Sequence, residues 1–150
     1  MKEGVVARKF LRAFAEWDLD TYASLLAPGA VEGRPQMGER FNGRDRIMGM
    51  YRSRQGEPPR IEWRRVHGEG QTWIGQGVIE DAAGVHGPDH IVALLKLDAG
   101  SVIAVDYYFA TALEPPDYHQ RFAQIVRALM QLVEQARVFD GDDGIRAKSF

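Results

Sequence analysis

Hydrophobic residues recur at helical spacing in the first third of the chain. Near the N-terminus, charged residues separate large apolar side chains at steps of three and four, which predicts an amphipathic helix. Its apolar stripe consists of Val6, Phe10, Phe14 and Trp17. A second helix is expected to begin at Asp18 or Asp20 and to end at Pro28-Gly29. A short strand over residues 30–34 follows, and Asn42-Gly43 opens a third helix.

From residue 60 the period changes to the alternation of half-buried strands, with β-branched and aromatic residues between glycine-rich turns. The four predicted strands are residues 60–68, 72–80, 90–98 and 101–111. Alternation in the last strand points Val105, Tyr107 and Phe109 to one face and Asp106 to the other. Helices followed by an antiparallel meander are typical of an α+β fold, in which the helices pack on one face of the sheet.

A second amphipathic pattern follows Pro115-Pro116. Asp117 is a candidate helix cap, and apolar residues recur at helical steps as far as Phe139. We therefore expect a single domain over residues 1–139 that includes a C-terminal helix over residues 117–139. This helix either covers a pocket or packs in an interface between subunits. The remaining residues, 140–150, are expected to form a flexible tail.

Composition narrows the classes of function. The chain has 150 residues, no cysteine and a net charge of −2, which excludes disulfides and thiolate catalysis and does not favour nucleic acid as a partner. It contains no apolar run of the roughly 18–20 residues that span a bilayer, and the first ten residues lack the apolar segment of a signal peptide. We therefore expect a cytoplasmic protein without membrane or nucleic-acid partners.

Three segments in the first half of the chain resemble the opening of SnoaL-like proteins of the nuclear transport factor 2-like superfamily. They are residues 14–22 (FAEWDLDTY), 25–31 (LLAPGAV) and 41–47 (FNGRDRI). Two later segments, 68–80 (GEGQTWIGQGVIE) and 99–109 (AGSVIAVDYYF), fit the strand pattern of the family. The resemblance implies a cone-like domain in which N-terminal helices pack into a strongly bent antiparallel sheet around a deep pocket.

The resemblance implies more than one kind of function. The superfamily contains polyketide cyclases, ketosteroid isomerase, scytalone dehydratase and limonene epoxide hydrolase, together with members that only bind or dimerise. It therefore implies a domain that binds a small apolar or aromatic molecule, with two classes left open because fold does not decide function. One is a cofactor-independent isomerase, cyclase or dehydratase that uses acid–base chemistry. The other is a noncatalytic ligand-binding or dimerisation module. A homodimer is expected.

The resemblance also places pocket-facing side chains on three strands. When the chain is matched to limonene epoxide hydrolase, the arginine–aspartate pair of that enzyme falls at Gln76 and Val78, and its last-strand aspartate falls at Tyr107. Asp106 is one residue out of phase, and a shift of one residue reverses the face of a strand. Epoxide hydrolysis by that mechanism is therefore disfavoured.

The candidate catalytic residues are Tyr107, Glu32 and Arg34. In an apolar pocket the tyrosine hydroxyl could donate a hydrogen bond to an enolate-like oxygen, while a carboxyl group with a raised pKa accepts a proton. Arg34 could orient an anionic or carbonyl group. The alternative is that Glu32 and Arg34 form a structural pair on one strand face and that Tyr107 belongs to the core.

The expected ligand-binding pocket is apolar and aromatic with few polar anchors. Its predicted lining is Trp17, Tyr22, Met37, Phe41, Ile47, Tyr51, Gln76, Val78, Val105 and Phe109. His86, Asp89 and His90 are metal-ligand types within five residues, but Gly87-Pro88 between them is explained equally well as a turn. We therefore expect neither a metal ion nor another cofactor.

Overall fold

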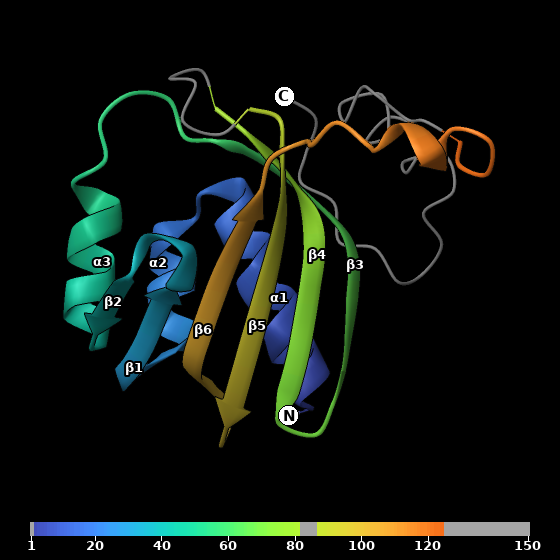
Figure 1. Ribbon diagram of the computed structural model, residues 1–150. Coiled ribbons are helices and arrows are strands. Elements are labelled where there is room, and N and C mark those ends of the chain that lie inside the picture. The colour runs from blue at the N-terminus through green and yellow to red at the C-terminus, as the bar shows by residue number, and fades with distance from the viewer. Residues whose placement is uncertain (1, 82–86, 125–150) are drawn as a thin grey trace.

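Six strands form one curved sheet in the part of the chain that the structure describes, residues 2–81 and 87–124 of this computed structural model (Figure 1). The strands are β1 (Leu26–Arg34), β2 (Glu39–Asn42), β3 (Arg60–Glu69), β4 (Thr72–Glu80), β5 (Asp89–Asp98) and β6 (Ser101–Ala110). They lie side by side in the order β2-β1-β6-β5-β4-β3. The antiparallel meander expected after residue 60 is present, because β3, β4, β5 and β6 pair in sequence.

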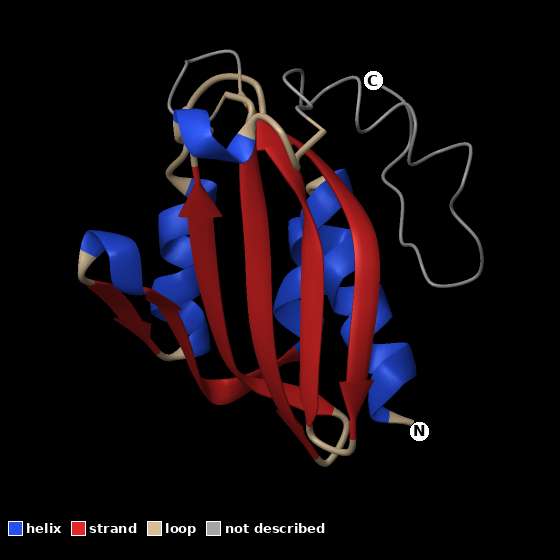
Figure 2. Ribbon diagram, turned by 45° about the vertical axis from the view of Figure 1, so that its right-hand side comes forward, coloured by secondary structure: helices blue, strands red, loops and turns tan. Residues whose placement is uncertain are grey.

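Helices cover one face of this sheet and leave the other face without a helix among the described residues (Figure 2). They are α1 (Glu3–Glu16), α2 (Leu19–Leu25) and α3 (Arg44–Arg52). Asp18 caps α2, since its carboxylate accepts a hydrogen bond from Thr21 N at 3.2 Å. None of the described helices is long and apolar enough to cross a bilayer. The result is the α+β architecture that the order of patterns predicts.

Strand β1 differs from the prediction in its length and in its direction. We expected a helix as far as Pro28-Gly29, but α2 ends at Leu25 and β1 begins at Leu26. Pro28 is tolerated within the strand because the register of β1 against β6 is irregular between Leu26 and Val31. The two strands run parallel, with Glu32 opposite Val105, so the sheet is mixed rather than wholly antiparallel. Strand β2, which pairs with β1, was not predicted.

Helix α1 lies directly against β3 and β4, the two strands at one edge of the sheet. Trp63 is fully buried there, and its indole Nε1 donates to Leu11 O at 2.8 Å. A Cβ atom at Gly75 would lie 2.7 Å from the Leu11 side chain and 3.2 Å from the Trp63 ring, so glycine allows the close contact between helix and strand at this position. Gly75 and Gly77 therefore face the helices, and Gln76 between them points to the opposite face.

The C-terminal helix predicted over residues 117–139 lies largely outside the described residues, which end at residue 124. Within the described part, residues Asp117–His119 form the 3₁₀ helix η2 instead of an α-helical turn. A second 3₁₀ helix, η1 (Pro35–Met37), connects β1 to β2.

Candidate functional site

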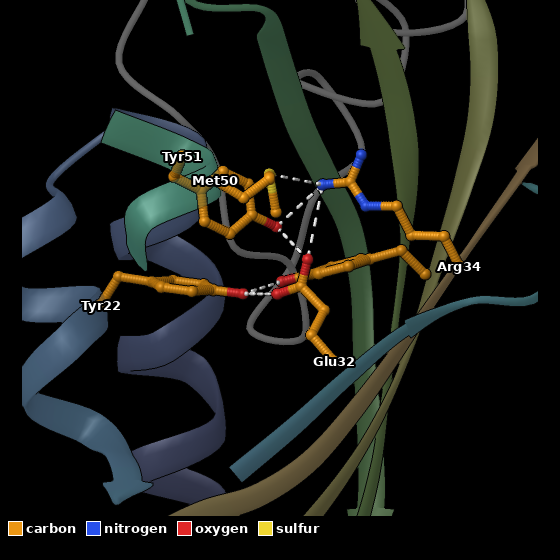
Figure 3. A network of polar contacts seen from close by, with 6 residues as sticks. Tyr22, Glu32, Arg34, Met50 and Tyr51 are labelled. Atoms are coloured by element: carbon orange, nitrogen blue, oxygen red, sulfur yellow. Dashed lines mark hydrogen bonds and ion pairs between the residues drawn. The ribbon is translucent and has the colours of Figure 1, made fainter. Parts of the chain in front are cut away.

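Five side chains from four elements gather between the sheet and the helices, around the carboxyl group that one of them carries. We call them the Glu32 network, and Figure 3 shows the contacts among them. Its members are Tyr22 from α2, Glu32 and Arg34 from β1, Tyr51 from α3 and Tyr107 from β6. Glu32 and Arg34 point to the same face because they are two positions apart on one strand. Helices α2 and α3 supply Tyr22 and Tyr51, and strand β6 supplies Tyr107.

Glu32 is the acceptor at the centre of the network. Its side chain has no solvent exposure. Tyr22 donates its hydroxyl hydrogen to Oε1 at 2.8 Å, and Tyr51 donates to Oε2 at 2.5 Å. Arg34 Nη2 lies 3.4 Å from Oε2 and 3.1 Å from the Tyr51 hydroxyl oxygen. Both carboxylate oxygens therefore have partners, which a buried acid requires.

Tyr107 joins the network through Tyr22 and does not contact Glu32 directly. Its hydroxyl oxygen lies 2.9 Å from that of Tyr22, and its side chain is fully buried. Helix α1 fixes both rings by stacking, with centroids 4.2 Å apart for Phe10 and Tyr22 and 4.8 Å apart for Phe14 and Tyr107. These aromatic contacts hold the hydroxyl groups in place beneath Glu32.

Burial controls the acid–base properties of the network. It raises the pKa of Glu32, because removal from water disfavours the carboxylate more than Arg34 and the two tyrosine hydroxyl groups stabilise it. Burial likewise raises the pKa of Tyr22, Tyr51 and Tyr107 well above that of free tyrosine, and the nearby Glu32 carboxylate adds to the effect. The tyrosines therefore stay protonated, and Glu32 is the acid that gains or loses a proton most easily.

Arg34 stays charged at the edge of the network. Burial by itself would lower the pKa of its guanidinium group, but the oxygens of Tyr51 and Glu32 outweigh that effect and raise it. Its guanidinium carbon lies 5.6 Å from the centre of the Tyr51 ring and 5.8 Å from that of the Phe109 ring. The cation therefore makes cation–π contacts with two aromatic side chains.

A pocket of about 80 Å³ opens beside the network, between α1, α3 and the sheet. It is lined by Phe14, Trp17, Arg34, Met50, Tyr51, Arg54, Pro59, Ile79 and Phe109. Arg34 and Tyr51 belong both to this lining and to the network, whereas Glu32 does not reach the pocket wall. A proton moving between the pocket and the carboxyl group therefore has to pass through the Tyr51 hydroxyl or beside Arg34.

Nine of the site residues that the sequence predicts lie in three environments, which are the pocket wall, the buried network behind it and the hydrophobic core. Trp17, Arg34, Tyr51 and Phe109 line the pocket. Tyr22, Glu32 and Tyr107 form the buried part of the network behind it. Ile47 and Val105 belong to the hydrophobic core, without contributing to the pocket wall.

Four predicted lining residues lie elsewhere. Gln76 is exposed because Gly75 and Gly77 occupy the inward positions of β4, so the assumed phase of that strand was wrong by one residue. Val78 shares the face of Gln76 and is buried away from the pocket. Met37 and Phe41 lie beyond the end of β1, where η1 and β2 carry them away from the pocket. Met37 is 47% exposed and Phe41 is half-buried.

Arg54, just after α3, is the main pocket residue that we did not predict. Its Nη2 atom lies 3.5 Å from Asp81 Oδ2, and its guanidinium group lies over the Trp17 ring, 5.9 Å from the ring centre. Local sequence offered no signal for it, because a charged residue after a helix is usually solvated. Among the described residues, no group of three or more potential ligands is placed to hold a metal ion, and His86 lies outside them.

Comparison with known proteins supports the resemblance seen in the sequence. A family model described as a SnoaL-like domain matches residues 7–105. A structure of an NTF2-like protein of unknown function from Burkholderia xenovorans is 27% identical, with a TM-score of 0.70 and coverage of 81% of this chain and 93% of that one. A search of curated proteins finds no match.

Two further solved structures share the fold at lower identity. A proposed ketosteroid isomerase from Kribbella flavida is 22% identical, with a TM-score of 0.72 and coverage of 83% of this chain and 89% of that one. An LEH-like epoxide hydrolase from M. tuberculosis is 19% identical, with a TM-score of 0.59 and coverage of 69% and 79%. Sequence identity at this level shows a shared fold and nothing about the reaction. The chemistry therefore has to be argued from the side chains of this chain.

Proposed function

The chain belongs to the SnoaL-like family, and from that premise we propose that it is an enzyme that moves a proton on a small, mostly apolar molecule without a cofactor. Isomerisation, cyclisation and dehydration are reactions of this type. The observation that carries the proposal is the fully buried Glu32 carboxyl group, which is connected to the pocket through Tyr51. A buried acid with a raised pKa beside a pocket is a typical acid–base group.

Tyr51 is the group through which Glu32 acts on the substrate. As the Tyr51 oxygen takes a proton from a substrate carbon next to a carbonyl group, the hydroxyl hydrogen of Tyr51 passes to Glu32 Oε2. The carbon–hydrogen bond breaks and its electron pair moves into the carbonyl group to form an enolate. Arg34, 3.1 Å from the Tyr51 oxygen, stabilises that negative charge. Transfer in the reverse direction to another atom completes an isomerisation.

Tyr107 has a different role in this proposal from the one we expected from the sequence. We expected its hydroxyl to donate a hydrogen bond to the substrate, but it does not line the pocket. It contacts the Tyr22 hydroxyl at 2.9 Å, and Tyr22 in turn donates to Glu32. Tyr107 is therefore proposed as a positioning residue that keeps the hydrogen bond to Oε1 in place.

Two tyrosine variants provide a matched test, because each removes one hydroxyl donor to Glu32 and only one of these hydroxyls belongs to a pocket-lining residue. The assay is proton–deuterium exchange of small carbonyl compounds in D2O, followed by NMR. We expect Tyr51→Phe and Glu32→Gln to lose roughly 10²–10⁴-fold in the rate of exchange, the usual contribution of an acid–base group. Tyr22→Phe should keep most of the rate. Equal rates in the wild type and in Tyr51→Phe would contradict the proposed proton path.

A noncatalytic ligand-binding module is the second candidate. It is favoured by the small pocket volume of about 80 Å³ and by the complete burial of Glu32, which leaves no carboxylate atom at the pocket wall. The same exchange assay separates the two functions. Binding of a compound without exchange in the wild type, at any pH at which the protein is folded, would favour the module.

We also propose that the protein forms a homodimer through the face of the sheet that carries no helix of the described part of the chain. Ile74 and Leu94 are register neighbours on this face, and they are 41% and 37% exposed. Apolar side chains gathered on an open face typically mark an interaction surface. Analytical ultracentrifugation should detect a dimer that Leu94→Glu converts to a monomer, whereas a monomeric wild type would contradict this proposal.

A further inference from the structure

Two arginines face the aromatic pocket, and we propose that they bind the carboxylate of a small, flat organic acid. This inference deepens the proposed function by naming the substrate class of the same site. It narrows the expected ligand from an apolar molecule to one that carries a negative charge at one end. Arg34 and Arg54 are the two cations in the pocket lining.

In both ion pairs around the pocket, the arginine side chain is accessible and the acidic side chain is buried. Arg34 is paired with Glu32 at 3.4 Å, and Arg54 is paired with Asp81 at 3.5 Å. The side chains of both acids are 0% exposed, whereas the arginine side chains are 16% and 29% exposed. A ligand in the pocket therefore meets two guanidinium groups, while the balancing negative charges lie behind them. Anions are favoured in such a site.

The guanidinium group of Arg34 has unused capacity to bind an anion. Its recorded hydrogen bonds to Glu32, Met50 and Tyr51 all use Nη2. Its Nε atom is buried and has no hydrogen-bond partner among the described residues. Figure 3 shows another guanidinium nitrogen directed away from the dashed contacts. Because a charged N–H donor makes a strong hydrogen bond to a carboxylate, this outward-directed nitrogen of Arg34 suits such a ligand.

The remaining pocket walls select a flat apolar body. Phe14, Trp17 and Phe109 bring aromatic rings to the pocket, and Ile79 and Pro59 add aliphatic surface. The volume of about 80 Å³ is small beside the roughly 300–1,000 Å³ of pockets for drug-sized ligands. A single ring or a short unsaturated chain is therefore the size of body that the pocket admits.

Carboxylate binding between the arginines would also orient the ligand for the proposed reaction. Arg34 Nη2 lies 3.1 Å from the Tyr51 hydroxyl oxygen. An acid held by Arg34 would therefore present a carbon near its carboxylate to Tyr51, the group that we propose as the proton carrier. Holding a substrate by its charged end so that the reacting carbon faces the catalytic group is a common use of arginine in enzymes.

Benzoate and benzamide give a direct test, because they share a ring and a shape and differ in charge at neutral pH. Binding is measured by isothermal titration calorimetry and by the fluorescence of Trp17, with Trp17→Phe to identify its signal among the tryptophans. A charge-assisted hydrogen bond contributes about 1.5–3 kcal/mol, so we expect benzoate to bind at least about tenfold more tightly than benzamide. Equal affinity for the two compounds, or no binding of either, would overturn the inference.

Arginine variants identify the binding groups. Arg54→Gln should weaken benzoate binding about tenfold or more and leave benzamide unchanged. Arg52→Gln is the matched control, because Arg52 lies two residues away on α3 and pairs with the exposed Asp20 at 3.2 Å. Arg34→Lys should weaken benzoate binding because lysine lacks the planar guanidinium group and its additional N–H donors. Equal effects of Arg54→Gln and Arg52→Gln would count against the inference.

The binding and exchange assays fail independently. Charge-dependent binding of benzoate without exchange of any small acid would retain the ligand class and remove the proposed proton transfer. Exchange of neutral carbonyl compounds together with equal affinity for benzoate and benzamide would retain the proposed proton transfer and remove the ligand class. Each result therefore decides one of the two proposals.

Discussion

Replacing Glu32 by glutamine tests whether the buried carboxyl group is able to hold a proton near neutral pH. Glutamine keeps the shape of the side chain and still accepts hydrogen bonds from Tyr22 or Tyr51, but it does not ionise. Burial raises the pKa of Glu32 in the folded protein, whereas in the unfolded chain the group faces water and titrates near about 4.3. Between these two pKa values the folded protein binds more protons than the unfolded chain.

Free energy of unfolding falls with rising pH wherever the folded state holds the additional proton. The stabilising contribution of protonated Glu32 is therefore fully present below about pH 4.3 and is lost as pH rises through the raised pKa. Each pH unit by which burial raises that pKa lowers the free energy of unfolding at higher pH by about 1.4 kcal/mol. Glutamine does not ionise, so the Glu32→Gln variant lacks this fall in the free energy of unfolding. The variant should therefore gain stability relative to the wild type as pH rises.

The measurement is urea unfolding of both proteins between about pH 4 and pH 8, with tryptophan fluorescence as the readout. Asp18→Asn is the control of opposite sign, because the side chain and backbone of Thr21 lower the pKa of that exposed cap carboxylate. A wild type that gains stability over Glu32→Gln with rising pH would show that Arg34 outweighs burial. In that case the pKa of Glu32 is lowered, and its role as a proton carrier loses its physical basis.

Two further predictions concern packing between α1, β3 and β4. Trp63→Phe removes the indole donor to Leu11 O and should lower the free energy of unfolding by about 1–3 kcal/mol in urea titrations. Gly77→Ala would place a Cβ atom 2.2 Å from the backbone oxygen of Glu62, and we expect a loss at the upper end of roughly 1–3 kcal/mol. Gly29→Ala meets no atom within 4 Å and should change stability little. Equal stability of the two alanine variants would contradict the close approach of the β3 backbone to Gly77.

The sequence by itself determined the elements whose signals are local. Periodicity and turn residues located the three helices before residue 60 and the long strands after it, since a helix buries every third or fourth residue and a strand every second. Alternation also gave the correct face for Tyr107, which is fully buried, and placed Glu32 and Arg34 together. Each of these inferences needs only neighbouring positions in the chain.

Only the tertiary structure decided what lies next to what. The parallel pairing of β1 with β6 and the contact of Tyr22 and Tyr51 with Glu32 join residues from separate elements. The spacing of hydrophobic residues along one helix or strand contains no information about distances between separate elements. On β4 the inward residues are glycines, and a residue without a side chain leaves no hydrophobic signal, so the face of Gln76 could not be read from the pattern. The packing of α1 against Gly75 determined that face.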